Sequence, residues 1–189
     1  MSEDDLDRLS ILADSAISRS KFANSLNADM IFDHLVNGVR NSRRRLEGAY
    51  PFLPIPLSEM SVLDIGCGSG AASVAIQSAG AKQVTSFDLN RDPLGIDFAL
   101  SRRNVHGVPR DLLLANGYQL PFGRCSFDLA WCEYVVEHVS ELDKLLSEAI
   151  RVLKPNGLMY IVTNNAWWPR EPHSGLWWAS WMPRKVAAR

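Results

Sequence analysis

The spacing of apolar positions changes near residue 57, and this change divides the chain into two parts. Before it, apolar residues recur every three or four positions, between Leu6 and Ile17 and again over residues 27–45. This period predicts two amphipathic helices. Prolines in residues 50–56 predict a linker after them. The run Arg43-Arg44-Arg45 is expected to complement the carboxyl end of the second helix, with a phosphate- or substrate-facing patch as the alternative.

From residue 57 onward, short apolar segments alternate with segments of helical character. Strands are predicted at residues 61–65, 83–88, 112–114, 127–132 and 158–163. The helices between them are predicted at residues 69–79, 93–105 and 140–153. This alternation predicts an α/β fold, a Rossmann-like, doubly wound and mostly parallel sheet with helices on both faces. We therefore expect an N-terminal helical cap and linker over residues 1–56 and a Rossmann-like domain over residues 57–189, with ligands bound at the carboxyl ends of the strands.

A glycine-rich loop, Asp-Ile-Gly-Cys-Gly-Ser-Gly at residues 64–70, follows the first predicted strand and opens a helix. Its glycines let the backbone approach a ligand closely, and the free N–H groups of the helix favour an acceptor-rich group. Asp88 ends the second strand, 18 residues after Gly70, where a carboxylate can accept hydrogen bonds from both ribose hydroxyls. The spacing from Gly66 to Ala71 also fits the dinucleotide fingerprint, so the loop alone leaves NAD and S-adenosylmethionine (SAM) open.

Composition narrows the class of partner. The net charge is -1, and no basic excess indicates a nucleic-acid partner. The start of the chain is acidic and lacks the apolar stretch of a secretory signal, and no apolar run reaches membrane-spanning length. The three cysteines lack metal-type spacing, so we expect a reduced, cytoplasmic protein without a metal site.

Five motifs carry a resemblance to a known family. Residues 62–70, Val-Leu-Asp-Ile-Gly-Cys-Gly-Ser-Gly, resemble motif I of class I SAM-dependent methyltransferases. The UbiE-like (type 11) branch of that family is resembled, in the same order, by residues 115–122 (ANGYQLPF), 126–130 (SFDLA), 137–139 (EHV) and 148–157 (EAIRVLKPNG). The resemblance covers about residues 62–163. It implies SAM as cofactor and favours SAM over NAD, the two ligands between which the loop alone does not decide.

The resemblance also implies which residues bind SAM. They are Asp64, Gly66, Cys67, Gly68, Gly70, Asp88, Leu89, Asn116, Gly117 and Tyr118. By this resemblance the three glycines of the loop are expected near the methionine part, and Asp64 is expected to help hold its amino group, directly or through water. Asp88 binds the ribose, and Leu89 packs on the adenine. Cys67 is expected to pack behind the loop.

The adenine end departs from the family pattern at one position. Family members carry Asp where this chain has Asn116. Its amide oxygen can still accept a hydrogen bond from the adenine amino group, but without charge assistance. Gly117 and Tyr118 are expected to offer backbone N–H groups to the adenine, and residues 120–122 to pack in the core.

Methyl transfer from a sulfonium is an in-line displacement that depends mainly on alignment, and a base is needed only if the acceptor must lose a proton. Candidate residues follow the fourth strand, namely Cys132, Glu133, Tyr134, Glu137 and His138. His138 is the candidate base, because histidine as a residue type can take up a proton near neutral pH, although a histidine bonded to neighbouring backbone is the alternative. His173 is the second catalytic candidate. Cys132 is expected to be a buried small residue and Asp128 to be structural.

Five of the six tryptophans fall in residues 164–183. We interpret this segment as a substrate-covering loop, with a weak membrane-surface contact as the alternative. No strand pair is visible after Pro183, so we expect the C-terminal antiparallel strands of the family sheet to be missing.

The sequence therefore predicts a cytoplasmic SAM-dependent methyltransferase that acts on a small-molecule acceptor. A non-catalytic SAM-binding scaffold is the alternative, and an NAD-dependent oxidoreductase is a third reading. The oligomeric state stays open.

Overall fold

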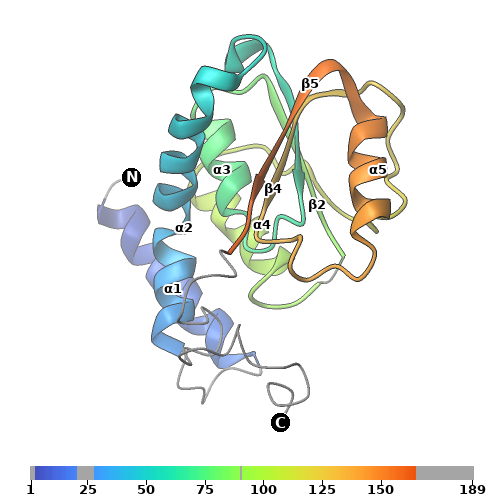
Figure 1. Cartoon of the computed structure of the whole chain (residues 1–189). Helices are drawn as coiled ribbons and strands as arrows, with labels where there is room; N and C mark the ends of the chain where they lie inside the picture. Colours follow the sequence, from blue (N-terminus) through green and yellow to red (C-terminus); the bar gives the residue numbers. More distant parts are fainter. Residues whose placement is uncertain (1–2, 21–27, 90, 165–189) are drawn as a thin grey trace.

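A computed structural model describes residues 3–20, 28–89 and 91–164 (Figure 1). The helices are α1 (Glu3–Ser18), α2 (Ala28–Ala49), α3 (Ala71–Ser78), α4 (Ile96–Val105) and α5 (Leu142–Val152), with short 3-10 turns η1 (Tyr50–Phe52) and η2 (Leu57–Glu59). The strands are β1 (Ser61–Ile65), β2 (Gln83–Asp88), β3 (Leu112–Leu114), β4 (Phe127–Glu133) and β5 (Leu153–Val162).

The strands form one parallel sheet in the order β3-β2-β1-β4-β5. The predicted Rossmann-like, doubly wound sheet is thus confirmed, and the chain reverses direction across the sheet between β1 and β4. The prediction for β5 was wrong at its start. Pairing with β4 begins at Leu153, opposite Phe127, and passes an irregularity before Leu158 pairs with Leu129.

Successive residues of each central strand serve opposite faces of the sheet, because side chains alternate along a strand. In β4, Leu129 and Trp131 pack on the face covered by α2 and α3. Ala130 and Cys132 belong to the cluster on the opposite face, which α5 covers (Figure 1). Trp131 also stacks on Tyr160 of β5 at 4.3 Å between ring centroids. Both faces of the sheet are therefore buried under apolar side chains, as is usual for a parallel sheet.

Of the two N-terminal helices, α2 packs beside α3 on the sheet, and α1 packs against α2 and α4. A Cβ at Gly38 of α2 would lie 3.0 Å from the Cβ of Ala71, so this glycine permits close approach of α2 to the start of α3. The expectation that α2 ends at the basic run was wrong. The helix continues to Ala49, because Leu46 and Ala49 extend its buried face.

Asp128 has the structural role expected of it. Its carboxylate accepts hydrogen bonds from the backbone N–H of Ser61 at 2.9 Å and from Nζ of Lys154 at 2.8 Å. It thereby joins the starts of β1, β4 and β5. Leu120 is buried in the core, as predicted for its segment. Within the described ranges, no helix is long and apolar enough to span a membrane. The tryptophan-rich segment and the expected loss of C-terminal strands lie outside the described residues.

Candidate active site

The glycine loop after β1 is fixed to the end of β2. The N–H of Cys67 donates to the carbonyl oxygen of Phe87 at 2.9 Å, and the N–H of Gly68 donates to Oδ2 of Asp88 at 2.8 Å. Gly66 and Gly68 have φ values of +63° and +48°, in the left-handed region that glycine adopts without strain. A Cβ at Gly66 would lie 2.6 Å from Cγ2 of Val135, whereas one at Gly68 would meet no atom within 4 Å. Glycine is therefore required at Gly66 for packing against Val135, whereas at Gly68 it leaves the backbone open to a ligand.

The other two loop positions face inward. Gly70 precedes α3 at a φ of +74°, and a Cβ there would lie 2.8 Å from the Cβ of Ala99. Gly70 thus fits α3 against α4 and lines neither cavity described below. Cys67 is buried, and burial, with Asp64 and Asp88 nearby, raises the pKa of its thiol. The thiol is therefore not a nucleophile at neutral pH.

A cavity of about 390 Å³ opens at the carboxyl ends of the strands, beside the loop. It brings together most of the predicted cofactor-binding residues and two of the candidates that follow the fourth strand, namely Gly66, Gly68, Asp88, Leu89, Asn116, Gly117, Tyr118, Tyr134 and His138. Phe87 and Leu145 add apolar lining. An apolar cavity with a few polar groups at one edge is typical of a nucleoside-type ligand site.

The segment after β3 forms a tight turn at this cavity. Oδ1 of Asn116 accepts the backbone N–H of Tyr118 at 2.9 Å, so this N–H is not free for the adenine in the structure. Gly117 is required by packing, because a Cβ there would lie 2.6 Å from Cδ1 of Leu145. The hydroxyl of Tyr118 accepts the N–H groups of Ser140 and Glu141 at 3.1 and 3.3 Å, at the start of α5.

A second cavity of about 170 Å³ lies on the α2 side of the loop. It shares Gly66, Gly68 and Tyr134 with the larger cavity, so the two meet at these residues. Its remaining lining comes from α2, β1, the loop, the start of α3 and β4, namely His34, Ser42, Asp64, Cys67, Ser69, Ala71, Ala72 and Glu133.

Asp64 is an unusual feature of the smaller cavity. Its side chain is 1% exposed, and its Oδ2 has no hydrogen-bond partner among the described residues. Desolvation, reinforced by the charge of Glu133, raises the pKa of this carboxyl to about 7, against the opposing effects of Arg103 and hydrogen bonds with Ser73. A buried acceptor without a partner costs free energy, and a cationic group in the cavity would relieve that cost.

Glu133 and Tyr134 are held by a residue from α2. Nη1 of Arg45 donates to Oε1 of Glu133 at 2.7 Å, and Nη2 donates to the hydroxyl of Tyr134 at 2.8 Å. Ser42 and Nε1 of Trp131 also donate to Glu133, at 3.2 and 3.0 Å. Tyr134 has a φ of +57°, uncommon for a residue with a side chain, and such backbone persists where its surroundings fix it.

Arg45 corrects the expectation for the basic run, since it binds the end of β4 and not the carboxyl end of its own helix. Sequence reasoning did not single out His34, Ser42 or Arg45 as residues of a site. Their spacing along α2 was the available signal, because residues 34, 38, 42 and 45 share one face of a helix.

The catalytic candidates fall in different places. His138 lines the larger cavity, and Glu137 accepts hydrogen bonds from Thr163 and Asn164, each at 3.2 Å. Cys132 is buried, as predicted, and burial raises the pKa of its thiol to about 12. His173 lies outside the described residues.

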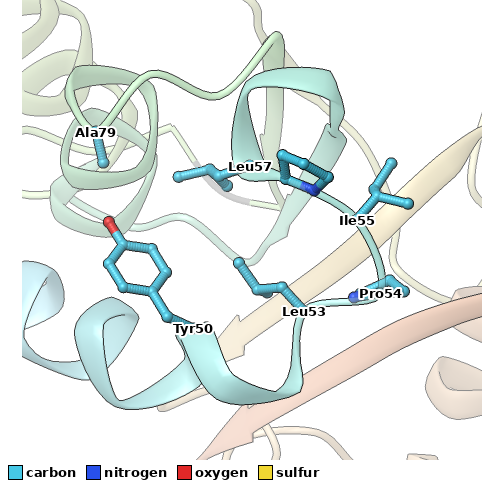
Figure 2. A pocket seen from close by; sticks show the side chains of 7 residues that line it. Tyr50, Leu53, Pro54, Ile55, Leu57 and Ala79 are labelled. Atoms are coloured by element: carbon cyan, nitrogen blue, oxygen red, sulfur yellow. The ribbon is translucent and has the colours of Figure 1, made fainter.

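A further hollow of about 500 Å³ lies where the linker meets the end of α3. Figure 2 shows Tyr50, Leu53 and Leu57 of the linker facing Ala79. The linker enters β1 here and α3 leads into β2, so this hollow lies at the amino ends of these strands, opposite the glycine loop. Its lining includes no acidic or basic side chain, so it offers no group for acid-base chemistry.

The parallel sheet, its reversal point and the glycine loop with Asp88 define the Rossmann-like class of nucleoside-binding α/β domains. Within that class, residues 63–161 match the family model Methyltransf_11, described as a methyltransferase domain. The chain belongs to this family.

Named relatives share this region. The chain is 34% identical over 110 residues to a ubiquinone biosynthesis O-methyltransferase from Rhizobium rhizogenes, covering 58% of this chain and 43% of the relative. It is 35% identical over 108 residues to the ubiquinone/menaquinone biosynthesis C-methyltransferase UbiE of Bartonella bacilliformis, covering 55% and 41%. The chain thus spans less than half the length of these two relatives.

A solved structure gives the same fold with a different printed activity. The crystal structure of the [4+2]-cyclase SpnF superposes with a TM-score of 0.55 at 25% identity, over 62% of this chain and 43% of that protein. The fold is therefore shared by proteins named for different reactions, and the function must be argued from the site.

Proposed function

We propose that the protein is a SAM-dependent methyltransferase that acts on a small-molecule acceptor. One observation carries the proposal: two cavities meet at the glycine loop, with the ribose-type acid Asp88 in one and the unpartnered carboxylate Asp64 in the other. Such a pair matches a ligand with a nucleoside at one end and an amino acid at the other. Membership of the methyltransferase family supports the same assignment.

The residues of the larger cavity fit the nucleoside of SAM. Asp88 has a second carboxylate oxygen beyond the one that accepts the Gly68 N–H, and it can accept from ribose hydroxyls. Leu89 is 63% exposed and offers an apolar surface for adenine to cover. Oδ1 of Asn116 has two lone pairs, so it can accept from the adenine amino group while it holds the Tyr118 N–H.

The smaller cavity fits the amino-acid end. The free Oδ2 of Asp64 is a partner for an ammonium group, and the first N–H groups of α3 can receive a carboxylate. Gly66, Gly68 and Cys67 bring backbone to the region between the two ends, whereas Gly70 contributes through packing. When bound, SAM supplies a methyl group on a positively charged sulfur.

The protein side of the reaction is alignment. Tyr134 lines both cavities, so it lies where the reacting end of the donor must be. Arg45 fixes this side chain from α2, and rigid placement of such walls holds the reacting atoms in line. His138 and His173 remain candidates for a base, which is needed only for an acceptor that loses a proton.

A second candidate function is SAM binding without methyl transfer. The cyclase with this fold and the replacement of the usual Asp by Asn116 favour it. A scaffold role and a reaction other than methyl transfer would both show SAM binding without methyl transfer. The NAD-dependent oxidoreductase loses its support, because the matched family is a methyltransferase domain.

Calorimetric titration of the 189-residue protein with SAM, S-adenosylhomocysteine and NAD tests the proposal. We expect binding of the first two and none of NAD, and loss of both in Asp88→Ala. A screen with methyl-labelled SAM and hydroxylated aromatic acceptors then measures transfer. Binding without transfer to any acceptor would favour the second function, and absence of SAM binding by folded protein would refute both.

We also propose a division into a helical cap with linker, residues 1–56, and a SAM-binding domain from residue 57. The small-molecule acceptor and a cytoplasmic location belong to the same proposal. Cys67, Cys125 and Cys132 are free thiols, which suits a reducing compartment. Expression of residues 57–189 alone tests the boundary, and we expect it to lose the smaller cavity's α2 wall.

A further inference from the structure

One face of α2 forms part of the site although α2 lies outside the matched segment 63–161. His34, Gly38, Ser42 and Arg45 lie on this face. A Cβ at Gly38 would lie 3.0 Å from the Cβ of Ala71, so this glycine lets the face lie against the start of α3. His34 and Ser42 then line the smaller cavity, so the cap contributes side chains directly to the ligand site.

Glu133 and Tyr134, which line the smaller cavity together with His34, already make hydrogen bonds. Oε1 of Glu133 accepts from Ser42 and Arg45, and Oε2 accepts from Trp131. The Tyr134 hydroxyl accepts from Arg45. These groups shape the cavity, and the hydrogen bonds of Glu133 hold its carboxylate in place.

The remaining acid-base groups divide between the two ends of the ligand. Asp64 is the only unpartnered carboxylate of the smaller cavity among the described residues, and the proposed function assigns it to an ammonium group. Asp88 and His138 line the larger, nucleoside cavity. His34 is the histidine that lines the smaller cavity, and the residue is partly open to solvent, so an acceptor can reach it.

On the basis of the proposed function, we propose that His34 is a catalytic residue that accepts the proton of a hydroxyl-bearing acceptor. The acceptor oxygen forms its bond to the methyl carbon as the carbon–sulfur bond breaks and that electron pair stays on sulfur. The hydroxyl proton passes to an imidazole nitrogen of His34 and then to solvent. The role of base is thereby assigned to His34 in place of His138, which lines the nucleoside cavity.

The surroundings of His34 keep its imidazole neutral, which the step requires. Desolvation, then Arg102 of α4 and Arg45 of α2, lower the pKa of His34 below its usual range, while Asp33 opposes them. Glu133 and Asp64 face the same cavity from β4 and β1. A neutral imidazole at pH 7 can take up a proton without first losing one.

Imidazole NMR tests the placement of His34 without any turnover. The signals of ¹⁵N-labelled histidines are assigned with His34→Gln and followed during titration with S-adenosylhomocysteine and with adenosine. We expect the former to shift the His34 signal and the latter to leave it unchanged. Saturation with S-adenosylhomocysteine that leaves the His34 signal unmoved would overturn this inference alone, whereas absence of binding to wild-type protein would refute the proposed function as well.

A pair of acceptors tests the chemical role. At a pH where 4-nitrocatechol is ionised and catechol is not, His34→Gln should slow transfer to catechol roughly a hundredfold and change transfer to 4-nitrocatechol little. Equal slowing of both acceptors would show a merely structural role and overturn the inference. Arg40→Gln is the matched control, because Arg40 is an exposed residue of α2 that lines neither cavity.

Discussion

The carboxylate of Asp88 accepts a hydrogen bond from the backbone N–H of Gly68, with 2.8 Å between Oδ2 and N. This bond joins the end of β2 to the loop after β1. The group proposed to bind the ribose therefore also orients the loop proposed to receive the rest of the cofactor. Both ends of the ligand site are set by one contact between neighbouring strands.

The two loop glycines should respond differently to alanine. Gly66→Ala introduces a clash 2.6 Å from Val135 and left-handed strain, so we expect a loss of roughly 2–4 kcal/mol of unfolding free energy. Gly68→Ala meets no atom within 4 Å, and strain alone should cost about 1 kcal/mol. Denaturant unfolding measures both.

The effect of these variants on SAM affinity should follow a different order from their effect on stability. Gly68→Ala should fold yet lose affinity for SAM, since its Cβ projects from backbone that lines both cavities. Val135→Ala added to Gly66→Ala removes the clash, so the double variant should lose less stability than the sum of the two single losses. Simple additivity would contradict the packing role of Gly66.

Asp64 should link stability to pH. Its pKa is raised from 3.8 to about 7, so its ionisation opposes folding, and the free protein should lose stability as pH rises between these two values and level off above about 7. Asp64→Asn removes this ionisation and should be more stable than wild type at alkaline pH by on the order of 3 kcal/mol. Thermal unfolding between acid and alkaline pH measures the difference, which should vanish at acid pH.

The same substitution should weaken SAM binding, because the amide lacks the charge that pairs with an ammonium group. Wild-type affinity should rise with pH through about 7 as Asp64 ionises, and Asp64→Asn should show no such rise. A pH-independent wild-type affinity would contradict the assignment of Asp64 to the amino group.

Arg45 should matter beyond its charge. Arg45→Met leaves Glu133, whose side chain is 11% exposed, without its cation and frees the Tyr134 side chain, so we expect a loss of about 2 kcal/mol of stability. Arg45→Lys keeps a charge but cannot hold both partners with the same geometry, and should restore only part of that loss. Full rescue by lysine would show that charge alone matters.

Asn116→Asp should strengthen cofactor binding. A carboxylate accepts a hydrogen bond from the adenine amino group with charge assistance, while it can keep the Tyr118 N–H bonded as Asn116 does at 2.9 Å. We expect affinity for SAM to rise roughly three- to tenfold in calorimetric titration. An unchanged affinity would show that Asn116 does not face the adenine amino group.

The fold could be predicted because its determinants are local. The apolar segments of β1, β2 and β3 are bounded by polar or turn residues, and the glycines of residues 66–70 require a turn wherever they lie. The start of β5 at Leu153 could not be predicted, because it depends on pairing with Phe127 across a register irregularity. The sequence around Leu153 and the sequence around Phe127 give no local signal of this pairing.

The α2 side of the site shows the same limit. Arg45 and Glu133 are 88 residues apart, and their contact exists only after α2 packs on α3 through Gly38. A run of three arginines is usually a solvated helix surface, and nothing local distinguishes the one that turns inward. The reversed expectation for Arg45 therefore reflects tertiary packing that helix period alone does not encode.

The Tyr118 hydroxyl accepts hydrogen bonds from the N–H groups of Ser140 and Glu141, the two residues just before α5, and the same tyrosine lines the nucleoside cavity. A nucleoside that immobilises this ring also immobilises the opening turn of an outer helix. Binding of a nucleoside in the cavity would then be detected at the protein surface, as slower deuterium uptake at the Ser140 and Glu141 amides.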